Sequence, residues 1–113
     1  MSALILTCNA GSSNTKLAAF DVDTLQQQDH VSVHKAEETI AWLKSHQNVV
    51  AVGHRVVHGG RSFTHPVRID DTVLQTLKDF IPLAPLHQPA AINFIEVTQK
   101  HYEDIPHIAC FDT

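Results

Sequence analysis

The chain has 113 residues, of which 43% are hydrophobic and 18% are charged. This balance is typical of one folded domain and argues against a disordered segment. The formal net charge of -4 argues against nucleic acid or an anionic membrane as a partner, and no apolar run reaches the roughly 20 residues that span a bilayer.

The amino-terminal residues lack the basic segment that begins a signal peptide. Cys8 and Cys110 lie far apart, each inside an apolar run, and the sequence has neither a CxxC pair nor a zinc-type spacing. We therefore expect a cytoplasmic protein with two buried, reduced thiols and no disulfide.

Antiparallel strands are predicted for the first part of the chain. Residues 3–8 form an apolar run, residues 9–14 are turn formers, and residues 15–22 form a second apolar run. This pattern indicates a β-hairpin with its tip at residues 9–14. Residues 27–35 alternate loosely in polarity and predict a third antiparallel strand.

A crossover to a covered strand follows. Residues 36–46 predict an amphipathic helix whose apolar face carries Ala36, Ile40 and Leu43. The continuous apolar run at residues 49–52 is typical of a strand that is covered on both faces. Residues 63–68 predict an irregular or edge segment, because Pro66 cannot donate a hydrogen bond to a sheet.

Two helices and a last strand complete the chain. Asp70 and Asp71 can cap a helix that ends at Pro82, with a buried face of Val73, Leu74, Leu77, Phe80 and Ile81. After a proline-rich loop, a helix is predicted from Pro89 to about residue 102, and a strand at residues 108–111. The order predicts an α/β fold, a mixed sheet that opens with a hairpin and is flanked by helices.

The hairpin tip is the first candidate for chemistry. Backbone N–H groups in a Gly/Ser turn can bind an anion, and Lys16 on the outgoing strand adds a positive charge. The tip is not a P-loop, because the GxxxxGK[ST] pattern is missing and a strand follows. An ordinary surface turn is the alternative.

The segment 49–61 is the stronger candidate. Arg55 lies among valines in a context that predicts burial, and a buried guanidinium needs an anionic partner. Gly59 and Gly60 would let a ligand approach the backbone at the end of the strand. The partner of Arg55 is either a bound carboxylate or phosphate, or a structural Asp or Glu. His54 and His58 could suggest a metal, but the sequence offers no third ligand nearby.

Two further residues lie at places suited to a site. His87 is held in a rigid loop between prolines, either as a structural hydrogen-bonding group or as a functional one. Asp112 follows the last apolar strand, a position that suits magnesium or phosphate chemistry and also a helix cap. The remaining histidines are predicted to lie on the solvated surface: His30, His34, His46, His65, His101 and His107.

Four segments together resemble one family. Residues 6–16, 53–60, 83–89 and 109–113 are similar, in this order, to the signature segments of the acetate/propionate kinases. This family belongs to the acetate and sugar kinase/Hsp70/actin superfamily. The resemblance implies a ribonuclease-H-like N-terminal domain over residues 1–113, with a C-terminal lobe that is absent from this sequence.

The resemblance also implies roles for eight residues. On the nucleotide side, Asn9 matches a residue associated with magnesium and phosphate, Ser12 a phosphate-side serine, and Lys16 a lysine near the ATP phosphates.

On the carboxylate side, Arg55 matches the arginine that binds the substrate carboxylate and the transferring phosphoryl group. Val57 and Leu86 match the apolar pocket for the acetate methyl group, His87 the loop histidine, and Asp112 the proton donor/acceptor.

The implied reaction is ATP plus acetate giving ADP and acetyl phosphate, reversibly and with Mg2+, in an intact enzyme that is a homodimer. The sequence departs from the family pattern at Asn14 and Gln88, in a short segment between Asp21 and Val49, and in its length. We therefore expect an N-terminal portion that is inactive alone. A short non-catalytic phosphate-binding module and a propionate kinase are the alternatives.

Overall fold

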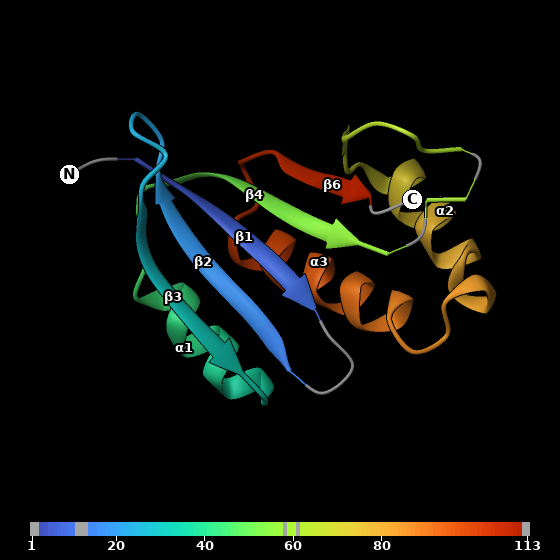
Figure 1. Cartoon of the computed structure of the whole chain (residues 1–113), viewed down its shortest axis with the longest axis horizontal. Helices are drawn as coiled ribbons and strands as arrows, with labels where there is room; N and C mark the ends of the chain where they lie inside the picture. Colours follow the sequence, from blue (N-terminus) through green and yellow to red (C-terminus); the bar gives the residue numbers. More distant parts are fainter. Residues whose placement is uncertain (1–2, 11–13, 58, 61, 112–113) are drawn as a thin grey trace.

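The computed structural model describes residues 3–10, 14–57, 59–60 and 62–111, and Figure 1 shows a sheet with helices. In chain order the elements are β1 (Leu4–Ala10), β2 (Thr15–Asp21), β3 (Gln27–Val33), α1 (Ala36–Lys44), β4 (Val49–Val56), β5 (Val67–Arg68), α2 (Asp71–Asp79), the 3-10 helix η1 (Ile81–Leu83), α3 (Gln88–His101) and β6 (His107–Phe111).

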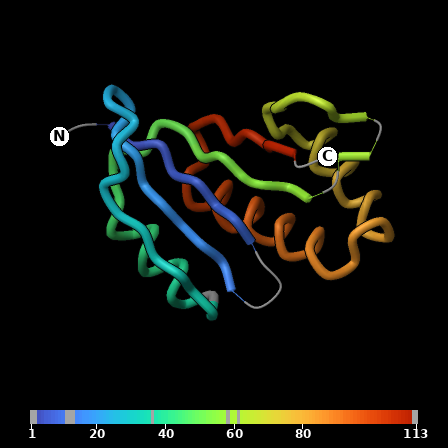
Figure 2. The backbone as a smooth tube through the Cα atoms, in the orientation of Figure 1, coloured from blue at the N-terminus to red at the C-terminus, as the bar shows by residue number. Residues whose placement is uncertain are grey.

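The described strands form one mixed sheet in the order β3-β2-β1-β4-β6-β5. β1, β4 and β6 are parallel, whereas β2, β3 and β5 pair antiparallel with their neighbours. Figure 2 traces the first crossover, from β3 through α1 to the start of β4. The predicted hairpin, third strand and mixed sheet are confirmed. The edge segment is also confirmed, as β5 at the border of the sheet.

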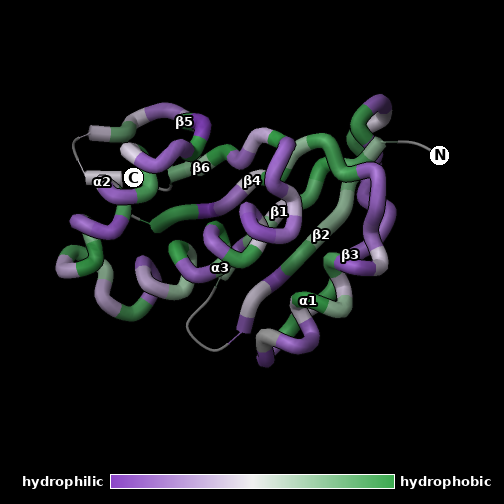
Figure 3. The backbone as a smooth tube through the Cα atoms, turned by 180° about the vertical axis from the view of Figure 1, so that it is seen from behind, coloured by the Kyte–Doolittle hydropathy of each residue, from purple (hydrophilic) through white to green (hydrophobic). Residues whose placement is uncertain are grey.

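The helices cover one face of the sheet and leave the other bare (Figures 1 and 3). In β1, Leu6, Cys8 and Ala10 are buried, and Leu6 and Cys8 belong to the core on the helical side. The residues between them point to the bare face and are only partly covered. The prediction that β4 is covered on both faces is wrong, because Val50 is 39% exposed. β4 continues past the apolar run to Val56 and ends shortly before the predicted Gly59-Gly60 terminus.

A local sequence signal explains the start of α2. α2 begins where the Asp70 carboxylate accepts a hydrogen bond from the Val73 N–H at 2.8 Å, as the predicted cap requires.

In α1 the predicted buried face is partly wrong: Leu43 is buried with Thr39, whereas Ile40 is 41% exposed. Within the described residues, no helix is long and apolar enough to cross a membrane.

Two histidines that were predicted on the surface are covered. The His46 ring packs against Trp42 with 4.0 Å between ring centroids, and its Nε2 lies 2.9 Å from Asp29 Oδ2. His107 is 3% exposed and its ring stacks on His54, which is also buried. His30, His34, His65 and His101 are exposed as predicted.

The hydrogen bonds of the buried pair fix the positions of its protons. His107 Nε2 donates to the Tyr102 carbonyl at 2.9 Å, so its Nδ1 is an acceptor and lies 3.4 Å from His54 Nε2. Thr98 Oγ1 donates to backbone carbonyls and accepts from His54 Nε2 at 3.1 Å. His54 Nδ1 is buried without a hydrogen-bond partner among the described residues. Burial, and then the charge of His107, lower the pKa of His54 to about 3.

Candidate active site

A row of polar residues crosses the bare face near the ends of β1 and β4. Asn9 on β1 pairs in register with Lys16 on β2 and with Arg55 on β4. Lys16 pairs in turn with Ser32 on β3, and Arg55 with Cys110 on β6. Residues directly opposite each other in a sheet share one face, so these five side chains form one line across five strands.

Arg55 does not lie in the buried context that was predicted. Its side chain is exposed, because β4 turns Val52, His54 and Val56 toward the helices and presents Arg55 on the bare face. Arg55 Nη1 donates to Asn9 Oδ1 at 3.4 Å, a long hydrogen bond between two predicted site residues. The guanidinium therefore lies on the exposed face of the sheet, beside the Asn9 amide.

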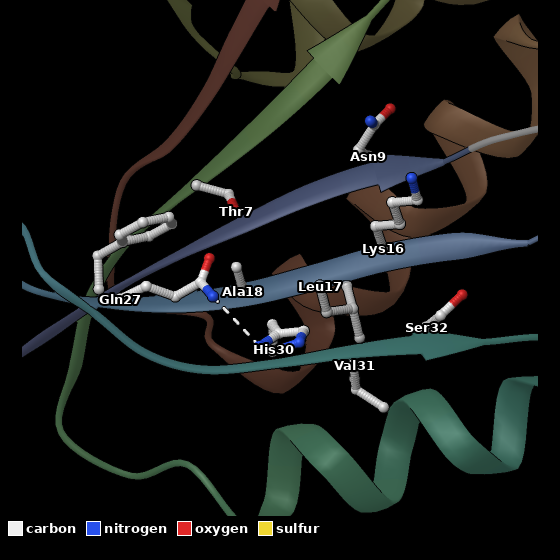
Figure 4. Close-up of a pocket in the computed structure, with 10 residues that line it drawn as sticks. Thr7, Asn9, Lys16, Leu17, Ala18, Gln27, His30, Val31 and Ser32 are labelled. Carbon is white, nitrogen blue, oxygen red and sulfur yellow. Dashed lines mark hydrogen bonds between the residues drawn. The ribbon is translucent and has the colours of Figure 1, made fainter.

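Asn9 and Lys16 also line an open groove of about 490 Å³ (Figure 4). Their side chains lie at one end of the groove, and Gln27 and His30 from β3 line another part of it. The row contains two fixed cations, Lys16 and Arg55, and no carboxylate. This arrangement attracts a phosphate or carboxylate group.

The same electrostatics bear on the predicted magnesium ligand. Mg2+ prefers carboxylate and other hard oxygen ligands, and the candidate oxygen here is Asn9 Oδ1. That oxygen accepts from the Arg55 guanidinium, so a dication bound to it would lie beside a cation. The residues of the polar row therefore fit an anion and do not fit Mg2+.

The predicted apolar residues come from two segments. Val57 is half-buried directly after β4, whereas Leu86 is 75% exposed, so its side chain faces solvent. His87 is half-buried at the start of α3, which begins at the edge of the sheet where β1 and β4 end (Figure 1). The buried Gln88 fixes this segment through a hydrogen bond from Nε2 to the Leu77 carbonyl at 3.1 Å.

Comparison with known sequences decides the family. The sequence pattern described as the acetokinase family matches residues 28–113, most of the chain. The chain belongs to the acetokinase family.

Individual relatives agree with this assignment. The acetate kinase of Rickettsia akari (strain Hartford) is 32% identical over 145 aligned residues, which cover all of this chain and 38% of the relative. The crystal structure of a propionate kinase from Francisella tularensis subsp. tularensis SCHU S4 superposes with a TM-score of 0.83 at 30% identity, covering 97% of this chain and 37% of that one. The Porphyromonas gingivalis acetate kinase structure gives a TM-score of 0.83 at 27% identity, with 99% and 38% covered.

These comparisons also confirm the predicted fold, which this acetokinase-family chain shares with the acetate and propionate kinase structures. The chain spans 38% of the length of the Rickettsia relative. The alignment has 145 positions for 113 residues, so the relative carries residues inside the matched region that this chain lacks. This agrees with the predicted shortening of an internal segment.

Two of the predicted site residues, Ser12 and Asp112, lie outside the described residues, as do His58 and Arg61. The roles of Ser12 and Asp112 stay predictions of the family resemblance. Sequence reasoning missed Ser32 and the position of Cys110, because the signal that places them in the row is the strand register. Cys110 was predicted to be buried and is exposed, while Cys8 is buried as predicted, and both thiols are free.

The two cysteines of this acetokinase-family chain are expected to differ in reactivity. Burial raises the pKa of the Cys8 thiol to about 12, so this cysteine is both inaccessible and protonated. Cys110 is exposed beside Arg55. N-ethylmaleimide should therefore modify Cys110 alone in the native protein, as peptide mass mapping would show. Modification of Cys8 at a comparable rate would contradict this placement, and the C110S variant is the control.

Proposed function

We propose that this chain carries part of the active site of a carboxylate kinase that transfers a phosphoryl group from ATP to acetate or another short carboxylate, reversibly. The observation that supports this function is the row of Lys16, Asn9 and Arg55, which presents two cations and an amide on one open face. Membership of the acetokinase family supports the same reaction class.

Arg55 is proposed to hold the substrate carboxylate and the phosphoryl group in transit, because a guanidinium can donate two parallel hydrogen bonds to either group. Asn9 orients Arg55 through its amide oxygen, and Lys16 neutralises phosphate charge from the neighbouring strand. Val57 and Leu86 are proposed to receive the acyl chain of acetate or propionate, with His87 beside them.

The chemistry needs little acid–base assistance. Acetate is already ionised at neutral pH, so a carboxylate oxygen can attack the γ-phosphorus without first losing a proton. The protein then acts by positioning and by electrostatic stabilisation of the phosphoryl oxygens. Asp112 is proposed to position the reacting groups, and Ser12 to contact phosphate. The family reaction uses Mg2+, which would have to be held by ATP and by residues other than those described here.

The domain assignment is also a proposal. Residues 1–113 would form the N-terminal lobe of a cytoplasmic, homodimeric enzyme, and the longer chains of the relatives would supply the rest of the site. In this arrangement the bare face carries one part of the substrate contacts, and a second lobe supplies the remainder.

Hydroxamate formation from acetate, ATP and hydroxylamine tests the function. We expect no turnover by the 113-residue chain and clear turnover by the protein that includes any residues encoded beyond Thr113, because half a site cannot position both substrates. Propionate in place of acetate would determine the acyl preference.

Turnover by the 113-residue chain alone would contradict the lobe assignment. Absence of turnover in both proteins would contradict the kinase function and favour a non-catalytic phosphate-binding module.

A further inference from the structure

Three phenylalanines from distant parts of the chain meet at the ends of β4 and β6. The rings of Phe63 and Phe111 stack with centroids 5.4 Å apart and an angle of 10° between their planes. Phe80 meets Phe63 edge-on, at 6.4 Å and 77°. Both geometries are favourable for aromatic pairs, and Phe63 and Phe111 pack against the same core cluster.

Two glycines fit against these rings. A Cβ atom on Gly59 would lie 2.7 Å from the Phe63 carbonyl oxygen and 2.8 Å from Phe111 Cδ1. A Cβ atom on Gly60 would lie 2.6 Å from Phe80 Cζ, and Gly60 has a φ of 59°, which favours glycine. The backbone that follows β4 is therefore pressed directly onto the aromatic rings.

Each aromatic residue belongs to a segment that carries predicted site residues. Gly59 and Phe63 follow Val57, and the Phe63 N–H donates to the Gly59 carbonyl at 3.1 Å. Phe80 accepts a hydrogen bond at its carbonyl from the Leu83 N–H at 2.9 Å, and so begins η1, which leads to His87.

Phe111 provides the third connection. It pairs in register with Val56, the last residue of β4, and follows Cys110 of the polar row. The rings thus join the segment after β4, the segment before α3 and the end of β6.

We propose that Phe63, Phe80 and Phe111, with Gly59 and Gly60, form an aromatic clamp that positions the carboxylate site. This inference rests on the proposed function. The clamp residues contact no substrate and are positioning residues. They fix the position of Arg55 and Val57 relative to Leu86 and His87. No strand pairing connects these two segments directly. A displacement of about 1 Å between reacting groups can reduce a rate by about 100-fold, so a loosened clamp should affect turnover before it affects folding.

Phe63→Leu tests the clamp, because it removes both ring contacts and keeps an apolar side chain. Phe94→Leu is the matched control: Phe94 is a partly buried phenylalanine of α3 that packs against the other core cluster. Both variants are assayed in the protein that includes any residues encoded beyond Thr113, at a temperature well below each variant's unfolding midpoint. F63L should lower kcat/KM for acetate at least about 10-fold and leave KM for ATP unchanged. F94L should keep kcat/KM within about 2-fold of wild type.

Amide NMR signals give a second readout that does not depend on activity. In the 113-residue chain, F63L should shift the signals of both Val57 and His87, and F94L should shift neither. If F63L does not fold, Phe80→Leu replaces it, because Phe80 meets Phe63 only by its edge.

Equal kinetics for the clamp variant and F94L would overturn the proposal, as would a His87 signal that does not respond. If wild-type protein shows no turnover, the proposed function fails. The Val57 and His87 amide signals then test the clamp separately. If both shift in F63L, the clamp stands as a connection between the two segments, and if only one shifts, the clamp is overturned.

Discussion

Arg55→Ala is expected to lower kcat/KM for the carboxylate by about 1,000-fold or more in the protein with any residues beyond Thr113, an effect typical of an arginine that stabilises a transferring phosphoryl group. The side chain is exposed on the bare face, so its loss should leave the fold intact. Hydroxamate formation at varied acetate and ATP concentrations measures the change, and thermal unfolding checks the fold.

Two further variants sharpen this experiment. Arg55→Lys keeps the charge and loses the planar fork, so it should recover only part of the activity. Arg68→Ala is the matched control, because Arg68 is an exposed arginine on β5 and outside the polar row. A loss of less than about 10-fold in R55A, or an equal loss in R68A, would contradict the role proposed for Arg55.

The native protein is expected to lose stability in mild acid because of the buried histidine pair. The pKa of His54 is lowered from 6.5 to about 3 in the folded chain, and burial also lowers the pKa of His107. The unfolded state therefore binds more protons below pH 6.5, and stability falls as the pH drops from 6.5 toward 3. The contribution of His54 is at most about 5 kcal/mol, a large share of the stability of a small domain.

Among the described residues, none lies within hydrogen-bonding distance of His54 Nδ1, the atom that would take the second proton. The Thr98 hydroxyl already accepts from His54 Nε2, and the Tyr102 carbonyl already accepts from His107 Nε2. The Cys8 thiol on the neighbouring strand is protonated and so provides no negative charge. Arg68 adds positive charge near His107.

Urea unfolding at about pH 7 and about pH 4 measures this effect. His54→Gln should reduce the difference between the two free energies of unfolding, whereas the exposed His30→Gln should leave it unchanged. An equal pH dependence in H54Q and wild type would show that other groups cause the acid sensitivity.

Most elements could be predicted from local pattern because their signals lie within a few residues. Asp70 caps α2 directly, and the turn formers between β1 and β2 separate two apolar runs. The exposure of Arg55 could not be predicted from the local pattern. The apolar run that begins β4 hides the alternation of the strand, and only the placement of the helices on one face shows that His54 points inward and Arg55 outward.

The polar row was partly predictable for a different reason. Family resemblance identified Asn9, Lys16 and Arg55, but their alignment across three strands follows from register, which the sequence does not state. The sequence predicts His107 on the solvated surface, because it lies in a polar or loop context, but it is the first residue of β6. Two contacts accompany its burial: the ring of His54, which is 53 residues away in sequence, and the carbonyl of Tyr102. The local sequence pattern specifies neither contact.

The central position of β1 has a consequence for synthesis on the ribosome. β1 is made first and can pair with β2 at once, but its other hydrogen-bonding edge must wait for β4, which begins at Val49. At typical translation rates the roughly 40 intervening residues take about 2 to 8 s. Once β2 has been made, the nascent hairpin presents the open edge of an apolar strand, which can pair with another molecule before β4 is available.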